Sequence, residues 1–195
     1  MLNKKITFQR AQGKIDVKIN NDEINRFYQS GSAKVFFPKS SQKFKELVLV
    51  NTAGGITSGD NFSYDFEIVN KSKIFLTTQT AERAYKGFNE KAKIKISLTV
   101  DDTSNLFWIP QELILFNNCN FDRNIEVNLN PNSNFLLAET TIFGRTAMGE
   151  YLEKGYFNDN WRINVNKNLI HAEALNLNGN IKESLSNFVS LIVSL

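Results

Sequence analysis

Apolar residues alternate with polar ones along most of the chain, in short runs separated by Asn, Gly, Asp or Ser. A period of two is typical of strands with one buried face, and the polar gaps are typical of turns. Clean alternation occurs at residues 14–20, 61–69, 92–100 and 124–129, and more continuous apolar runs at 34–38, 46–50 and 73–80. The series continues at 106–110, 113–116, 134–143, 151–157, 161–166 and 169–179. This spacing predicts an all-β, mainly antiparallel fold of two stacked sheets.

Helix signals occur in two places. Residues 80–86 could form one short helical turn, and residues 181–195 carry apolar side chains along one helical face. The apolar positions of the second segment are Leu185, Phe188, Val189 and Ile192. The pattern stops on an apolar residue, so we expect a partner or further sequence to cover this face. We find no linker, convincing internal repeat or domain boundary, which indicates a single domain over residues 1–195.

The amino-acid composition excludes several classes of protein and of functional site. Of the 195 residues, 42% are hydrophobic and 22% charged, which excludes disorder over the whole length. A net charge of +3 is too weak to indicate nucleic-acid binding. One cysteine and one histidine exclude a disulfide framework and a metal site with several imidazoles. The first residues show no apolar leader pattern and the longest apolar run is shorter than a membrane span, so we expect neither a secretory leader nor membrane attachment, and a cytoplasmic protein.

The most distinctive motif is NTAGGITSGD, residues 51–60, which contains Gly54, Gly55 and Gly59. Glycine allows positive φ and close approach, so this segment could lie against a ligand or another chain. A phosphate-binding loop would need Lys and then Ser or Thr after the last glycine, and Asp60 and Asn61 stand there instead. The alternative is a tight connection in which Asp60 accepts hydrogen bonds from local N–H groups.

A second motif, LTTQTAERAYKG at residues 76–87, places hydroxyl and amide side chains directly after a buried strand. These polar groups, which include Thr78 and Gln79, could line a wet cavity or could satisfy one another. For Glu82 and Arg83, the sequence favours a solvated surface pair over a functional site.

Two further motifs carry carboxylates. In WIPQELILF, Glu112 stands between apolar runs and would need a partner such as Arg83 or Arg145. In LLAETTIFGRTAMGE, Glu139, Arg145 and Glu150 occur among small residues that include Gly144 and Gly149. Paired carboxylates can act in acid–base catalysis, but structural ion pairing is the favoured interpretation here.

Cys119 and His171 are weak candidates for a borderline metal such as nickel or zinc. A partly buried, hydrogen-bonded histidine and a thiol at a turn are the favoured alternatives. Together the two residues do not make a closed, high-affinity site, so no fixed metal site is predicted.

Taken in order, four motifs resemble the urease accessory protein family UreD, called UreH in some organisms. They are NTAGGITSGD, LTTQTAERAYKG, WIPQELILF, and IFGRTAMGE followed by WRINVNKNLIHAEALNL. The resemblance implies a non-enzymatic scaffold for metallocentre assembly, with two stacked sheets and a few helices. It implies as partners UreF, the GTPase UreG and the urease apoprotein, and a water-filled tunnel through which nickel passes. No tightly bound cofactor is implied, only a nickel ion in transit.

Carried onto this chain, the resemblance gives nickel-passage candidates and a set of structural positions. The passage candidates are Asp60, Thr78, Gln79, Glu112, Glu139 and Glu150, and the structural positions are Gly54, Gly55, Gly59, Arg83, Gly144, Arg145 and Gly149. Oxygen ligands that bind weakly suit passage, whereas a cluster of His and Cys would trap nickel. Asn117 and Asn118 stand where the family often has an acidic residue. Family members usually continue beyond the position of Leu195, so the chain is expected to lack the family's final strands, as a fragment, a truncated product or a reduced version.

Two other functions stay open from the residues alone. A hydrolase could use Glu112 or Glu150 as acid or base, which would require two carboxyl groups facing a closed-ended pocket. A β-sandwich module for sugars or peptides would require exposed aromatic side chains on one flat face. Trp108 and Trp161 instead lie within apolar strand patterns.

Overall fold

The protein is built almost entirely from strands, which form three sheets in a computed structural model that describes residues 9–39 and 43–186. In spatial order the seven-stranded sheet contains β15 (Asn168–Asn180), β14 (Lys154–Val165), β11 (Asn120–Leu129), β8 (Ala92–Val100), β5 (Asn61–Val69), β1 (Gln12–Asn20) and β2 (Glu23–Gly31). The five-stranded sheet contains β12 (Asn134–Leu137), β9 (Asn105–Trp108), β6 (Lys73–Thr78), β4 (Lys45–Asn51) and β3 (Ala33–Phe36). The three-stranded sheet contains β13 (Thr141–Phe143), β10 (Leu113–Leu115) and β7 (Glu82–Ala84).

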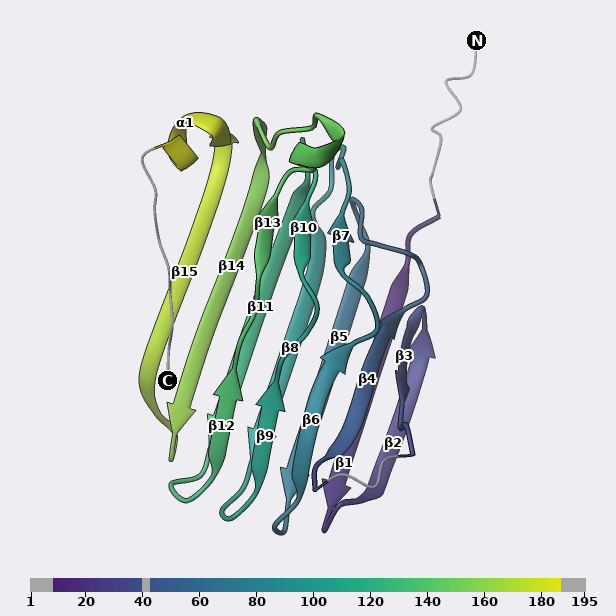
Figure 1. Ribbon diagram of the computed structural model, residues 1–195, viewed down its shortest axis with the longest axis vertical. Coiled ribbons are helices and arrows are strands. Elements are labelled where there is room, and N and C mark those ends of the chain that lie inside the picture. Colours follow the sequence, from purple (N-terminus) through teal and green to yellow (C-terminus); the bar gives the residue numbers. More distant parts are fainter. Residues whose placement is uncertain (1–8, 40–42, 187–195) are drawn as a thin grey trace.

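The chain winds through these sheets as a solenoid (Figure 1). From β5 to β13, each turn contributes one strand to the seven-stranded sheet, then one to the five-stranded sheet, then one to the three-stranded sheet. The next turn lies beside the previous one, so equivalent strands pair in parallel. The seven-stranded and five-stranded sheets face each other, and the core lies between them.

The expectation of a mainly antiparallel fold is wrong, although the expectation of a mostly β protein is confirmed. Only the pairs β1–β2, β3–β4 and β14–β15 are antiparallel among the described strands. Polar–apolar alternation usually indicates an antiparallel sheet because parallel sheets are normally covered on both faces. Here the outer face of a parallel sheet is open to solvent, so alternation and parallel pairing occur together.

Turn residues with positive φ close the two hairpins β1–β2 and β14–β15, but between β5 and β9 they connect sheets that face each other. Asn70 and Lys71, at φ of 55° and 64°, turn the chain from β5 into β6. Thr103, at φ of 68°, makes the equivalent turn from β8 into β9. Local sequence shows where such turns occur, but it does not show which strands they bring together.

A structural repeat is present although no sequence repeat was found. Tyr64, Ile96, Ile125 and Trp161 occupy one register row across β5, β8, β11 and β14. All four side chains are buried. What repeats from strand to strand is a position that faces the core, and the residue type at that position changes. The repeat is therefore not visible in the sequence.

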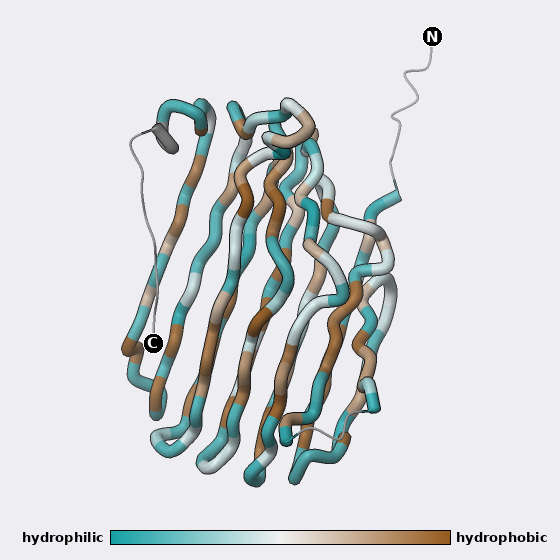
Figure 2. Tube along the Cα trace, in the orientation of Figure 1, coloured by the Kyte–Doolittle hydropathy of each residue, from teal (hydrophilic) through white to brown (hydrophobic). Residues whose placement is uncertain are grey.

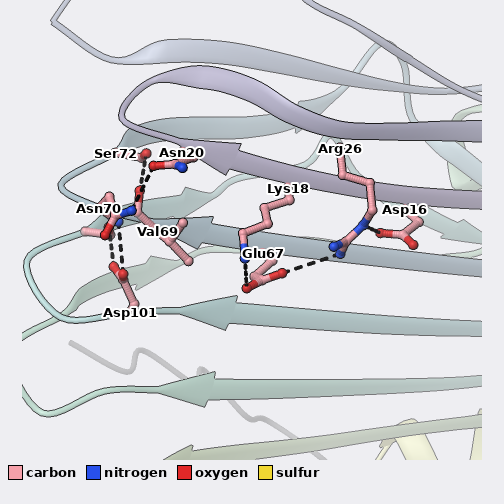
Figure 3. A network of polar contacts seen from close by, with 10 residues as sticks. Asp16, Lys18, Asn20, Arg26, Glu67, Val69, Asn70, Ser72 and Asp101 are labelled. Carbon is pink, nitrogen blue, oxygen red and sulfur yellow. Dashed lines mark hydrogen bonds and ion pairs between the residues drawn. The ribbon is translucent and has the colours of Figure 1, made fainter.

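Hydrophobic and hydrophilic residues alternate along the strands (Figure 2), and the burial pattern of β5 and β8 assigns them to an inner and an outer face of the seven-stranded sheet. The inner face includes Phe62, Phe66, Phe121 and Phe157, each no more than 1% exposed. The outer face near β1, β2 and β5 is covered by an ionic network (Figure 3). In this network Lys18 pairs with Glu67 at 2.6 Å and Arg26 with Asp16 at 2.8 Å. The pairs are partly exposed, so they contribute little stability and mainly keep this face polar.

Farther along the same outer face, asparagine side chains form ladders between neighbouring turns. Asn160 donates to Asn124 at 3.1 Å, and Asn164 donates to Asn128 at 3.1 Å. Such ladders stabilise parallel, in-register strands because each amide bonds to the turn beside it.

Two local predictions need correction or qualification, and two elements were not predicted. Residues 82–84 form strand β7, so a helical turn at 80–86 is wrong. Strand β2 was not predicted, because most of its side chains are exposed and its alternation is weak. The predicted C-terminal helix begins as α1 (Ile181–Ser186), and its remaining residues lie outside the described part of the chain. A short 3-10 helix, η1 (Thr146–Met148), was not predicted. In the described part of the chain, no helix is long and apolar enough to span a membrane.

Candidate functional site

A cavity of about 50 Å³ lies behind the glycine-rich segment, at the point where β6 leads into β7. Its polar walls include Asn51, Tyr64, Thr78 and Glu82, which come from β4, β5, β6 and β7. Gln79 and Arg83 also line it. The winding of the chain brings these residues together, because in each turn the end of a strand in one sheet lies beside the start of a strand in the next sheet.

Glu82 is the acidic group of this cavity. The Asn51 side-chain amide donates to both carboxylate oxygens at 3.3 and 3.2 Å, and the backbone N–H of Arg83 donates to Oε1 at 3.2 Å. Burial raises the pKa of Glu82 to about 7, against the opposing effect of these two donors. Burial, with a smaller contribution from the Glu82 charge, raises the pKa of Tyr64 well above its usual value, so this phenol stays neutral. Glu82 is therefore partly protonated at neutral pH.

A second cavity of about 50 Å³ adjoins the first. Both are lined by Leu49, Tyr64, Thr78 and Glu82, so these residues form a shared wall. The second cavity extends to Trp108, Arg123, Glu139 and Thr140. Oxygen-bearing side chains therefore occur in both cavities, from the glycine-rich segment towards β11, although the second cavity is lined mostly by apolar side chains such as Ile94, Ile96 and Phe121.

Arg123 lies at the centre of a buried ionic cluster. Its Nε and Nη2 atoms bond to Asp159 at 2.8 and 2.5 Å, and Nη2 also lies 2.7 Å from Glu139 Oε2. The indole N–H of Trp108 donates to Glu139 at 2.6 Å, and that of Trp161 donates to Asp159 at 3.1 Å. Burial raises the pKa of Glu139, and Arg123 opposes this shift. Burial alone would lower the pKa of Arg123, but Glu139 and Asp159 raise it, so the guanidinium stays charged.

The raised pKa of Glu82 predicts a pH-dependent stability. The folded chain holds this proton up to about pH 7, whereas the unfolded carboxyl loses it near 4.5. The free energy of unfolding therefore falls as pH rises through this window, and Glu82→Gln removes the loss. We expect the variant to match the wild type near pH 4.5 and to be about 2 kcal/mol more stable at pH 8, allowing for partial solvent screening.

Urea denaturation at the two pH values measures this difference. Glu126→Gln, at an exposed position on the outer face of β11, is the matched control and should show no comparable dependence on pH. Equal stability of Glu82→Gln and the wild type at pH 8 would contradict the assigned protonation.

Asp60 is buried, but it does not line either cavity. Its side chain instead holds the backbone of neighbouring segments in place. Its two oxygens accept from the backbone N–H groups of Thr57 and Ala11, both at 2.8 Å. The Thr57 N–H is a local donor of the kind expected for Asp60, whereas Ala11 lies 49 positions away along the chain. Gly54 and Gly59, at φ of 77° and 79°, provide the bends of the same segment.

Glu150 pairs with Arg145 next to η1 and accepts from the backbone N–H of Asn117 at 2.9 Å. These donors, led by Asn117, lower the pKa of Glu150. Structural ion pairing is therefore confirmed for Glu150. Gly149, at φ of 72°, ends η1, and Gly144, at φ of 83°, begins the turn before it.

Among the other candidates, Thr78, Gln79 and Glu139 line the cavities, and Glu112 does not. The half-buried Glu112 contributes its backbone carbonyl, which accepts from the N–H of Glu82 at 2.8 Å. Neither Glu112 nor Glu150 faces the interior cavities, so the two-carboxylate pocket required of a hydrolase is not formed by them.

Cys119 and His171 do not meet. The buried Cys119 lies beside Tyr156 at the start of β14, whereas the half-buried His171 pairs with Ile163, roughly 20 Å farther along that strand. Within residues 9–39 and 43–186, no group of three or more His, Cys, Asp or Glu side chains could hold a metal ion.

Sequence reasoning missed Asn51, Tyr64, Arg123 and Asp159, and it placed Glu82 on the surface. A signal was present for two of them. Arg123 lies between Phe121 and Ile125, and Asp159 lies between Phe157 and Trp161, at positions where alternation points to the core. A charge at an inward position of an alternating strand needs a buried partner. The pairing itself could not be foreseen, because it depends on β11 and β14 being neighbours.

Comparisons with known proteins agree with one another. The family model described as UreD urease accessory protein matches residues 9–191. Urease accessory protein UreD of Rhodopseudomonas palustris strain BisB5 is 41% identical over 176 residues, which are 88% of this chain and 62% of that protein. UreD of Mesorhizobium japonicum is 37% identical over 84% of this chain and 58% of that protein. UreD 1 of Brucella anthropi is 36% identical over 92% of this chain and 66% of that protein. The chain thus spans roughly three fifths of the length of these relatives.

Proposed function

Because the chain belongs to the UreD urease accessory protein family, we propose that it acts in urease maturation as a non-enzymatic scaffold with an internal passage for nickel. In this role it bridges the urease apoprotein to UreF and UreG. The nickel ion is cargo that moves through the protein and does not stay bound.

The observation that carries the passage is the wall shared by the two interior cavities. Thr78, Tyr64 and Glu82 place hydroxyl and carboxylate oxygens at the point where the cavities adjoin. Oxygen ligands suit a hydrated divalent cation, and a conduit works only if each position releases the ion again. Glu82, which is partly protonated near neutral pH, offers such a weak and reversible charge.

The passage proposed for this chain runs from Gln79 and Glu82 past Thr78 to Glu139. It uses three of the predicted positions and adds Glu82. Asp60 and Glu150 support the segments around it, since their carboxylates are bonded to backbone N–H groups.

Glu82→Gln tests the passage directly. The chain is co-expressed with UreF, UreG and the urease subunits, and urease activity, nickel content and co-purification are measured. We expect activation to fall about fivefold while the complex stays intact, because loss of one charge about 4 Å from a hydrated, water-screened cation weakens the attraction by about 1 kcal/mol.

Glu126→Gln is the control for the activation experiment and should activate urease as the wild type does. Normal nickel content and activity with Glu82→Gln would refute the passage, whereas loss of co-purification would point to a purely structural effect of the substitution.

A further inference from the structure

Arg123 occupies the place that a cation would take between two buried carboxylates. A single nitrogen, Nη2, lies 2.7 Å from Glu139 Oε2 and 2.5 Å from Asp159 Oδ2. The three side chains are only 8%, 10% and 9% exposed. The guanidinium therefore acts as a tethered, permanent positive charge that both carboxylates share.

The rest of the cluster holds the carboxylates in position. The Trp108 indole bonds to the second oxygen of Glu139, and the Trp161 indole bonds to Asp159. Two carboxylates fixed in this way, with little access to water, repel each other unless a positive charge lies between them. A divalent cation would satisfy the same requirement, and such a preorganised, dry pair would bind it strongly.

The cluster also adjoins the proposed route, since Arg123 and Glu139 both line the second cavity. An ion that passes Thr78 and Glu82 thus approaches two carboxylates that would retain it if they were free. Strong retention is incompatible with passage.

We propose that the guanidinium of Arg123 keeps Glu139 and Asp159 from capturing the divalent cation, so that the cation can move on through the passage. This inference rests on the proposed function for its biological meaning. The binding of a cation after removal of the guanidinium can be tested without reference to that function.

The test is nickel binding to the purified 195-residue chain, by equilibrium dialysis with nickel ions alone as the probe. Arg123→Met keeps a similar shape and removes the charge. We expect this variant to bind one nickel ion at least about tenfold more tightly than the wild type does. Arg123→Lys keeps a charge beside the carboxylates and should bind nickel no better than the wild type.

The double variant Arg123→Met/Glu139→Gln should lose the gained affinity, because one of the two ligands is gone. If Arg123→Met is unfolded without metal, the inference requires that nickel restore its circular dichroism spectrum. A variant that stays unfolded with nickel, or that folds and binds nickel as weakly as the wild type, overturns the inference.

The urease activation experiment separates this inference from the proposed function. Gained nickel affinity in Arg123→Met, together with nickel retained on the chain and a fall in urease activation, supports both. If Arg123→Met fails to capture nickel while Glu82→Gln still impairs activation, only the role of Arg123 is overturned.

Discussion

Replacement of Arg123 by alanine should lower the free energy of unfolding by about 3–5 kcal/mol. The guanidinium is the positive partner of Glu139 and Asp159, and its loss leaves two buried carboxylates without compensation. They would have to take up protons or admit water, and both responses cost stability. Urea denaturation at pH 7, followed by circular dichroism, measures the change.

A triple variant provides the control for this prediction. Arg123→Met, Glu139→Gln and Asp159→Asn together remove all three charges and approximately keep their volumes. Breaking a buried pair is costly, whereas replacing the whole group by neutral residues is often nearly neutral. We therefore expect the triple variant to recover most of the lost stability. A triple variant as unstable as Arg123→Ala would show that shape, and not charge, is the main contribution of the cluster.

Gly55→Ala should destabilise the protein by about 3–4 kcal/mol, through backbone strain and overpacking together. Gly55 has a φ of 147°, which side chains rarely tolerate, and an added Cβ would lie 2.3 Å from the Tyr85 ring and 2.8 Å from the carbonyl oxygen of Arg83. Tyr85 can rotate away, but the Arg83 carbonyl is fixed because it accepts from the N–H of Ile56 at 2.8 Å. Thermal and urea denaturation of the variant measure the loss.

Gly54→Ala is the matched control for this substitution. Gly54 is the adjacent residue and also has positive φ, 77°, but an added Cβ would meet nothing within 4 Å. Its cost should therefore be limited to backbone strain of about 1 kcal/mol. Equal losses for the two variants would rule out close packing of β7 against Gly55 as the cause.

Alternation along the chain was sufficient to locate most strands, because a half-buried strand must alternate whichever partner it has. It predicted residues 61–69 and 92–100 with the bounds that β5 and β8 have. It could not indicate that these two strands pair in parallel, 32 positions apart at Tyr64 and Ile96. Strand direction depends on the path of the chain through the other two sheets, and no local pattern records that path.

The candidate site was predictable to the extent that local sequence determines it. Thr78 and Gln79 were recognised because polar groups directly after a buried strand need partners, and both line a cavity. Glu82 was assigned to the surface because its neighbour Arg83 suggested an exposed pair. Its amide partner, Asn51, comes from the preceding turn of the solenoid, 31 positions away, so only the fold could reveal it.

The winding of β5 to β14 also bears on how the protein can form during synthesis. Each turn from β5 onward pairs with a turn that precedes it in the chain, so its template has already left the ribosome when the new strands emerge. Such a chain can add turns one after another, in the direction of translation. During synthesis, the newest turn of such a protein has an outer edge that no strand yet covers, and that exposed edge is where a chaperone would be needed.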